Sequence, residues 1–171
     1  MTHPPIALRQ TSRRAVLRAL PVAALGVADA TAVAQPAGGG SELAVQVVKR
    51  FWDAFNRAAW SELDGLVTPN YAHHPPGKTL TLDQFKAGGA WVHKGLGGYR
   101  LEFDSVIASG SDVATRWTAT GTHVGSMFGE APTNRQVAVQ GMHFHTVSAG
   151  RIAADWEVID FDGFKAQLRR G

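Results

Sequence analysis

The feature that most constrains the fold is a change in the hydrophobic pattern near Tyr99. Before it, apolar residues recur at helical spacing, as at Ala44, Val48, Phe51 and Phe55. After it, apolar and polar residues alternate, which is typical of strands with one buried face. Helices followed by an antiparallel meander predict an α+β fold, with the helices packed on one face of a curved sheet.

Three helix starts are predicted in the first half of this domain. Ser41, Ser61 and Thr81 are all residue types that favour the N-cap position. Thr81 is followed three residues later by Gln84, the spacing of a capping box. Residues 70–77, rich in histidine and proline, are predicted to form a loop between the second and third helices.

The second half is predicted to form four strands and a final helix. The expected elements are strands near 99–107, 113–119, 137–147 and 152–160 and a helix at 161–169. On the last strand, the even-numbered residues from Ile152 to Asp160 are predicted to share one face. Ala149-Gly150 is predicted to be a tight turn between the last two strands.

Positive charge is concentrated at the N-terminus. Four of the 17 Lys and Arg residues lie in the first 18 positions, and the 13 that remain after residue 35 are balanced by 13 acidic residues. The formal net charge of +3 therefore belongs to the N-terminal segment. The sequence predicts no basic patch for nucleic acid in the folded part.

Residues 1–34 have the layout of a secretory signal peptide. A basic region precedes an apolar stretch, and small residues at Ala32-Val33-Ala34 stand before Gln35. The run Ser12-Arg13-Arg14-Ala15-Val16-Leu17-Arg18 resembles the twin-arginine motif. We expect export by that route to the periplasm or the outside, with no membrane association after cleavage. The alternative is an uncleaved membrane anchor.

The remaining sequence divides simply. Residues 35–41, which include Pro36 and a glycine run, are predicted to be a flexible tether. Residues 42–171 are predicted to be the single folded domain.

With no cysteine in the chain, disulfides, thiolate metal sites and a cysteine nucleophile are excluded. Phosphate-binding glycine motifs and the nucleophile elbow are also absent, which leaves acid–base chemistry or binding.

Asp160 is the first candidate for chemistry. It is predicted to share a strand face with Ile152 and Trp156, where an unpaired carboxylate costs several kcal/mol. A carboxylate kept in such a place is suited to proton transfer. The alternative is that Asp160 lies at the strand end and caps the final helix.

Histidines form the second group of candidates. His143 and His145 project from one face of the same predicted strand, and His74 lies in the predicted loop. Three interpretations remain open: a metal site made by all three, hydrogen bonding to a substrate or to Asp160, or burial as ordinary core histidines. Further candidates for ligand binding are Tyr71, His73, Arg116, Trp117, His145 and Trp156.

An ordered set of short motifs resembles the SnoaL-like polyketide cyclases, or ester cyclases, of the nuclear transport factor 2-like superfamily. The resemblance covers roughly residues 43–168. It rests on Asn56 with Trp60, Tyr71-Ala72-His73-His74-Pro75, the run 112–123, Phe128-Gly129, Pro132-Thr133-Asn134-Arg135, Gly141-Met142-His143, Gly150-Arg151-Ile152, Trp156, Asp160 and Gln167-Leu168.

The resemblance implies a conical α+β barrel with an apolar pocket, in a homodimer or homotetramer. It implies that Asp160 is the acid/base of an intramolecular aldol closure, assisted by His143 and His74, without metal or organic cofactor. The expected ligand is a small apolar carbonyl or polyketide-like compound. Isomerisation and dehydration occur in the same superfamily, and a non-catalytic binding module of this fold is the alternative to an enzyme.

Overall fold

The computed structural model describes residues 39–169. The predicted signal peptide and residues 35–38 of the predicted tether lie outside the described residues. In chain order the elements are α1 (Gly39–Asn56), the 3-10 turn η1 (Trp60–Glu62), α2 (Leu63–Leu66), β1 (Val67–His74), α3 (Leu82–Gly95), β2 (Leu96–Ser109), β3 (Asp112–His123), β4 (Gln136–Ser148), β5 (Arg151–Ile159) and α4 (Phe161–Arg169).

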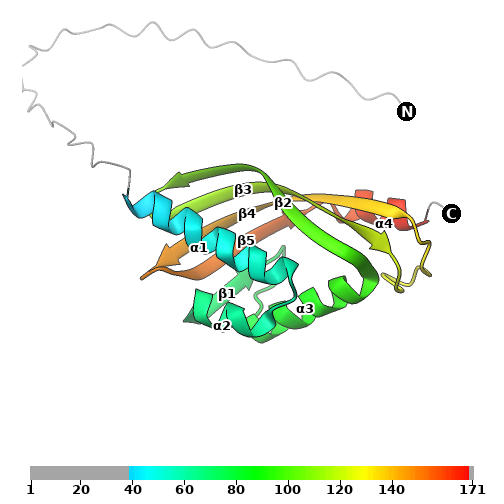
Figure 1. Cartoon of the computed structure of the whole chain (residues 1–171), viewed down its shortest axis with the longest axis horizontal. Helices are drawn as coiled ribbons and strands as arrows, with labels where there is room; N and C mark the ends of the chain where they lie inside the picture. Colours follow the sequence, from blue (N-terminus) through cyan, green and yellow to red (C-terminus); the bar gives the residue numbers. More distant parts are fainter. Residues whose placement is uncertain (1–38, 170–171) are drawn as a thin grey trace, which may run out of the picture. The chain divides into compact units, whose positions relative to one another are not determined.

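The five strands form one sheet in the order β1-β5-β4-β3-β2. Strands β2 to β5 make the predicted antiparallel meander, and α1, α2 and α3 lie on one side of it (Figure 1). This confirms the predicted α+β fold. The sheet is mixed rather than wholly antiparallel, because β1 pairs with β5 in parallel.

The predicted loop at 70–77 is wrong in its first half. Residues up to His74 belong to β1, and only the segment after it is irregular. Pro69 lies inside this strand, which is possible because β1 is at the edge of the sheet and Pro is tolerated where no ladder hydrogen bond is needed. The strand carries Tyr71 and His73 towards the interior, and both are buried.

The predicted face of the last strand is also wrong beyond Ile152. Thr146 and Val147 are consecutive in β4, but they pair with Ala154 and Ile152, so β5 carries an extra residue at this point. Such a bulge shifts the alternation of side chains by one position. Ile152 is buried as predicted, but beyond the bulge the odd-numbered residues point inward instead of the even-numbered ones.

Helix α1 supplies much of the core against the sheet. Its Phe51 is fully buried and Trp52 and Phe55 nearly so, each of which stabilises the fold by about 1.5–3 kcal/mol through apolar burial. At its C-terminus, the Asn56 amide accepts from the Leu101 backbone N–H at 2.8 Å and donates to the Leu101 carbonyl at 2.9 Å. These two hydrogen bonds fix α1 against β2.

The helix starts are partly as predicted. Thr81 caps α3 in a full capping box with Gln84, as predicted. Ser41 lies inside α1 rather than at its cap, and its hydroxyl accepts from the Gly110 backbone N–H in the β2–β3 turn at 2.9 Å. Within residues 39–169, no helix combines the length and the apolar character needed to cross a membrane.

Candidate functional site

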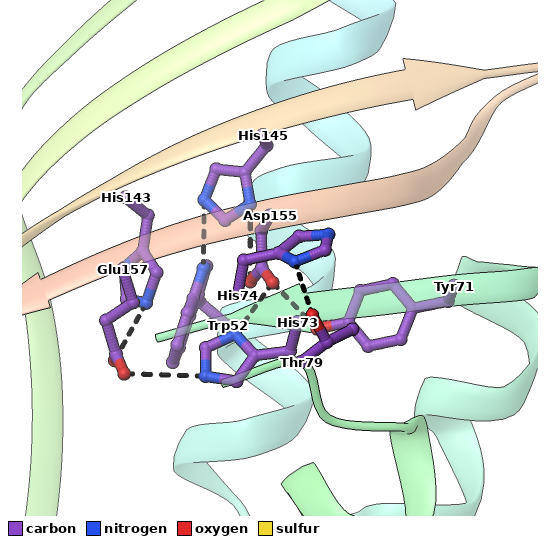
Figure 2. Close-up of polar contacts among 9 residues, drawn as sticks. All are labelled: Trp52, Tyr71, His73, His74, Thr79, His143, His145, Asp155 and Glu157. Carbon is purple, nitrogen blue, oxygen red and sulfur yellow. Dashed lines mark hydrogen bonds and ion pairs between the residues drawn. The ribbon is translucent and has the colours of Figure 1, made fainter. Parts of the chain in front are cut away.

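Three neighbouring strands bring acidic and histidine side chains together on the inner face of the sheet. In the register of β4 with β5, His143 lies opposite Glu157 and His145 lies opposite Asp155. In the register of β1 with β5, His73 lies beside Asp155. Figure 2 shows these five side chains gathered against α1.

Asp155 is fully buried in this cluster, with 0% of its surface exposed. Its Oδ1 atom accepts a hydrogen bond from the Tyr71 hydroxyl at 3.1 Å and lies 2.7 Å from His73 Nδ1. Both contacts fall on Oδ1, and the other oxygen, Oδ2, has no hydrogen-bond partner among the described residues.

Glu157 lies between two histidines. Its Oε1 atom is 3.0 Å from His143 Nε2, and its Oε2 atom is 3.4 Å from His73 Nε2. His73 therefore bridges the two carboxylates, with Nδ1 towards Asp155 and Nε2 towards Glu157 (Figure 2). The contact of His73 with Glu157 is longer than its contact with Asp155, so it is the weaker of the two interactions.

His145 completes the cluster on the side of α1. The Trp52 indole N–H points to His145 Nε2 at 3.5 Å, and because an indole only donates, Nε2 is an acceptor. The ring proton of neutral His145 is then on Nδ1, which lies 3.8 Å from Asp155 Oδ2. Trp52 also contacts the His143 ring, at 4.6 Å between centroids.

The electrostatics of the cluster favour a charged pair at His73 and Glu157. Burial alone would lower the pKa of His73, but its hydrogen bonds to Asp155 and Glu157 outweigh this and raise the pKa to about 9. Burial would raise the pKa of Glu157, but hydrogen bonds from His143 and His73 lower it to about 2. At neutral pH His73 is an imidazolium and Glu157 a carboxylate.

His145 behaves in the opposite way. Burial and the neighbouring His143 together lower the pKa of His145 to about 3. It is therefore neutral at ordinary pH, consistent with the hydrogen bond that its Nε2 atom accepts from Trp52.

A cavity of about 440 Å³ opens onto this cluster. His73 and Glu157 are part of its wall, and most of the rest is apolar or aromatic. Buried lining residues such as Trp52 and Trp117 mark its inner end, and the exposed Phe128 marks its rim. An apolar cavity with a few polar groups at one place is the usual form of a small-molecule site.

The sequence between residues 45 and 168 matches the family model described as SnoaL-like polyketide cyclase. The chain belongs to this family. Among curated proteins, none matches the sequence at a significant level.

Solved structures share the SnoaL-like fold. A proposed SnoaL-like polyketide cyclase from Jannaschia sp. CCS1 has a TM-score of 0.72 at 18% identity, covering 80% of this chain and 99% of that one. AclR, a proposed hydroxylase from Streptomyces galilaeus, has a TM-score of 0.70 at 22% identity, covering 75% and 85%. IdmH, a proposed polyketide cyclase from Streptomyces antibioticus, has a TM-score of 0.68 at 23% identity, covering 73% and 97%.

In this SnoaL-like domain, five of the residues singled out from sequence lie in or beside the cluster. Tyr71, His73, His143 and His145 belong to its hydrogen-bonded contacts. Trp117 lines the cavity and stacks on the His143 ring with 5.4 Å between centroids.

Three other candidates lie away from the cavity. His74 stacks on Trp156 at 5.0 Å between centroids and hydrogen-bonds Thr79, and neither His74 nor Trp156 is among the residues that line the cavity. Arg116 is exposed on the face of β3 opposite Trp117. Side chains alternate between the two faces of a strand. His74, Trp156 and Arg116 therefore point to the outer face of the sheet, whereas their neighbours in sequence point inward.

Asp160 lies just past the end of β5 and is exposed. Its Oδ1 atom accepts from the Gly163 backbone N–H at 2.9 Å, and its carbonyl accepts from the Phe164 N–H at 3.1 Å. This is the geometry of an N-cap on α4, which was the alternative interpretation of the residue. The expected apolar surroundings of Asp160 are absent because the bulge turns the even-numbered positions of β5 outward.

Sequence reasoning missed Asp155, Glu157 and Trp52. The two acids stand two residues apart on a strand, which places them on one face, and that spacing was available as a signal. It was not used because Ile152 indicated that the other face of the strand was buried. Trp52 lies on a helix with buried aromatic neighbours, Phe51 and Phe55, so its sequence context gives no sign of a contact with His145.

The geometry does not assemble the metal site considered from sequence. His74 is separated from His143 and His145 because it packs against Trp156. Within the part of the chain that the structure describes, no three His, Asp or Glu side chains are arranged to hold a metal ion.

Proposed function

We propose that this SnoaL-like protein carries out acid–base chemistry on a small apolar carbonyl compound bound in the cavity, with Glu157 as the base and His73 as the acid. One observation carries the proposal: the carboxylate and the imidazolium both line the same apolar cavity, 3.4 Å apart. An acid and a base side by side are what removal of a proton next to a carbonyl requires.

The low pKa of Glu157 is compatible with this role because it depends on His73. In the resting site the His73 and His143 hydrogen bonds hold the Glu157 pKa at about 2. When His73 passes its proton to the substrate oxygen, one positive charge beside Glu157 disappears. The basicity of Glu157 then rises as it accepts the proton, so the two transfers support each other.

For an intramolecular aldol closure the atoms balance as follows. Glu157 removes a proton from the carbon next to a carbonyl while His73 Nε2 gives its proton to that carbonyl oxygen, which yields an enol. The enol carbon forms a bond to a second carbonyl carbon of the same molecule. Glu157 returns its proton to the new alkoxide and the enol proton returns to His73. Isomerisation would use the first step and return the proton to a different carbon.

The first step can be tested without the natural substrate. We expect the protein to catalyse exchange of the methyl protons of 2-acetonaphthone with deuterium from D₂O, measured by proton NMR. Glu157→Gln removes the base but keeps the shape, so the catalysed exchange should fall by roughly 10²–10⁴-fold. Glu102→Gln is the matched control, because Glu102 is exposed and ion-paired with Arg100.

Two results would contradict the proposal. One is an exchange rate in Glu157→Gln equal to that of the unaltered protein. The other is a protein that binds 2-acetonaphthone without accelerating its exchange, which would favour the non-catalytic binding module.

We propose further that the protein is exported by the twin-arginine route. The support is in the sequence, in the pair Arg13-Arg14 and the apolar stretch that follows. Changing both to lysine should retain the full-length precursor in the cytoplasm, as seen by immunoblotting of cell fractions. A mature N-terminus at Met1 in the exported protein, found by N-terminal sequencing, would refute cleavage near Gln35.

We also propose that two copies associate through the outer face of β4 and β5. Four large apolar side chains are exposed there in two cross-strand pairs, Met142 with Val158 and Phe144 with Trp156. A contiguous apolar patch on a soluble domain marks an interaction surface, and a homodimer would cover it with an identical patch.

A further inference from the structure

Tyr99 is a polar residue of the cavity that the proposed chemistry does not use. It lies on β2, where its neighbour Arg100 points outward to Glu102, so the Tyr99 ring points inward. The ring packs against Phe55 and His93, at 5.7 and 4.9 Å between centroids, and it lines the cavity.

The Tyr99 hydroxyl has no hydrogen-bond partner within residues 39–169. The other tyrosine, Tyr71, donates its hydroxyl proton to Asp155 at 3.1 Å. A hydroxyl in an apolar setting ordinarily finds an acceptor, because an unmet donor costs about 1–3 kcal/mol. Burial and the charge of Glu157 both raise the pKa of Tyr99, so its hydroxyl keeps its proton and remains a donor.

Neither of the two wall side chains with an acceptor oxygen, Glu157 and Gln84, accepts a hydrogen bond from Tyr99 in the described residues. Glu157 already receives hydrogen bonds from His143 and His73 on its two oxygens. The Gln84 side-chain oxygen is used in the capping box of α3. A ligand oxygen bound in the cavity would supply the acceptor that these two side chains do not.

Tyr99 and Glu157 also come from different strands of the cavity wall. Their strands are β2 and β5, separated in the sheet by β4 and β3. Between them the wall is formed by apolar surface, including Trp117 of β3 and Val139 of β4. A molecule that reaches both polar points has to span this apolar surface.

We propose that Tyr99 donates a hydrogen bond to a second oxygen of the ligand, so that the cavity selects a flat apolar molecule with an acceptor oxygen at each end. One oxygen lies at His73 and Glu157, and the other lies at the Tyr99 hydroxyl. The inference rests on the proposed function in that the same cavity holds the ligand, but it concerns binding and is tested without turnover.

The test uses two probes that differ in one oxygen. 2,6-Diacetylnaphthalene has a carbonyl at each end, and 2-acetyl-6-ethylnaphthalene has nearly the same shape with one carbonyl. We expect the unaltered protein to bind the diacetyl probe about 3- to 10-fold more tightly, as measured by calorimetry, which corresponds to one hydrogen bond. In Tyr99→Phe this preference should disappear while the affinity for the one-carbonyl probe stays within about two-fold.

Thr118→Val is the control variant. It removes a hydroxyl that already has an acceptor, Asp104 at 3.0 Å, and that does not line the cavity, so the ratio of the two affinities should stay as in the unaltered protein. Infrared spectra of the ¹³C-carbonyl diacetyl probe give an independent reading. One carbonyl stretch should shift to higher frequency in Tyr99→Phe, because it loses a donor.

Three outcomes would overturn the inference. They are equal affinities of the unaltered protein for the two probes, an equal loss of both affinities in Tyr99→Phe, and failure of the protein to bind either probe. If deuterium exchange fails but the two-oxygen preference is found, the acid–base proposal falls and the role of Tyr99 stands.

Discussion

His73 is the residue on which the charge state of the site depends. It is buried between Asp155 and Glu157, and these contacts hold its pKa at about 9. The imidazolium is present in the folded protein at neutral pH, whereas an unfolded histidine with a pKa of about 6.5 is mostly neutral there.

This difference predicts how stability depends on pH. The folded-state pKa of His73 is raised, so its contribution to stability is complete below about pH 6.5 and is lost as the pH rises towards about 9. We expect the melting temperature to fall between pH 7 and pH 9.5, as measured by circular dichroism. His73→Gln should flatten the pH dependence in this interval. An equal slope in both proteins would show that His73 is not the group responsible.

The same pKa predicts the alkaline limit of activity. If His73 is the acid, the catalysed deuterium exchange should be nearly constant from pH 6 to 8 and decline above about pH 9. Glu157 is already ionised throughout this range, since its pKa is about 2. A catalysed rate that rises through pH 9 would contradict the assignment of His73 as a proton donor.

At the scale of single residues, the sequence predicted some of the site. The alternation along β4 correctly placed His143 and His145 on one inner face. The partner acids were missed because their direction depends on one extra residue in β5, and a bulge has no reliable sign in a strand without glycine. The position of Tyr99 was visible, but its unpaired hydroxyl depends on what the other elements place around it.

At the scale of the elements, α4 shows what Asp160 does in this fold. The Asp160 side chain satisfies the Gly163 backbone N–H, and α4 then buries Phe164 and Leu168 against the sheet. An added Cβ at residue 163 would collide with the Asp160 carboxylate, so glycine at this position belongs to the same cap.

Removing this cap should cost stability in a graded way. Asp160→Ala should lower the free energy of unfolding by about 1 kcal/mol, whereas Asp160→Asn should cost much less because Asn also accepts from the helix N-terminus. Urea unfolding followed by fluorescence would measure both. Equal losses in the two variants would show that the capping hydrogen bond is not what the carboxylate contributes.

The helices and strands were predicted correctly where local sequence signals were strong. Prediction failed where an element's structure depends on its place in the sheet. The capping box at Thr81 fixed the start of α3, and the alternation in β3 and β4 fixed their inner faces. Most of strand β1 was predicted as a loop because residues 70–77 are rich in histidine and proline. Its pairing at the sheet edge is with a strand about eighty residues later in the chain, and such a pairing has no local signal.

At the scale of the whole molecule, the apolar outer face of β4 and β5 predicts self-association. Val158→Arg places a charge in the centre of this patch, where 64% of the Val158 surface is exposed in the single chain. We expect the unaltered protein to sediment as a dimer or tetramer and Val158→Arg as a monomer in analytical ultracentrifugation. Leu43→Ser, which changes an exposed apolar residue of α1, is the control and should leave the assembly intact.

A monomeric unaltered protein at tens of micromolar would contradict this prediction. Nothing in the cavity requires the association, because His73, Glu157 and Tyr99 all come from the same chain. Loss of the dimer in Val158→Arg should therefore leave the affinity for the diacetyl probe unchanged.

In the proposed chemistry Glu157, and not Asp160, is the carboxylate that moves the proton. The two lie three residues apart, one in the wall of the cavity and one at the exposed start of α4. The most direct test is the catalysed deuterium exchange of 2-acetonaphthone in Glu157→Gln and Asp160→Asn, measured side by side. If Glu157 is the base, we expect this assignment to give a loss of roughly 10²–10⁴-fold in Glu157→Gln and less than about two-fold in Asp160→Asn. The reverse order, with Asp160→Asn inactive and Glu157→Gln active, would contradict it.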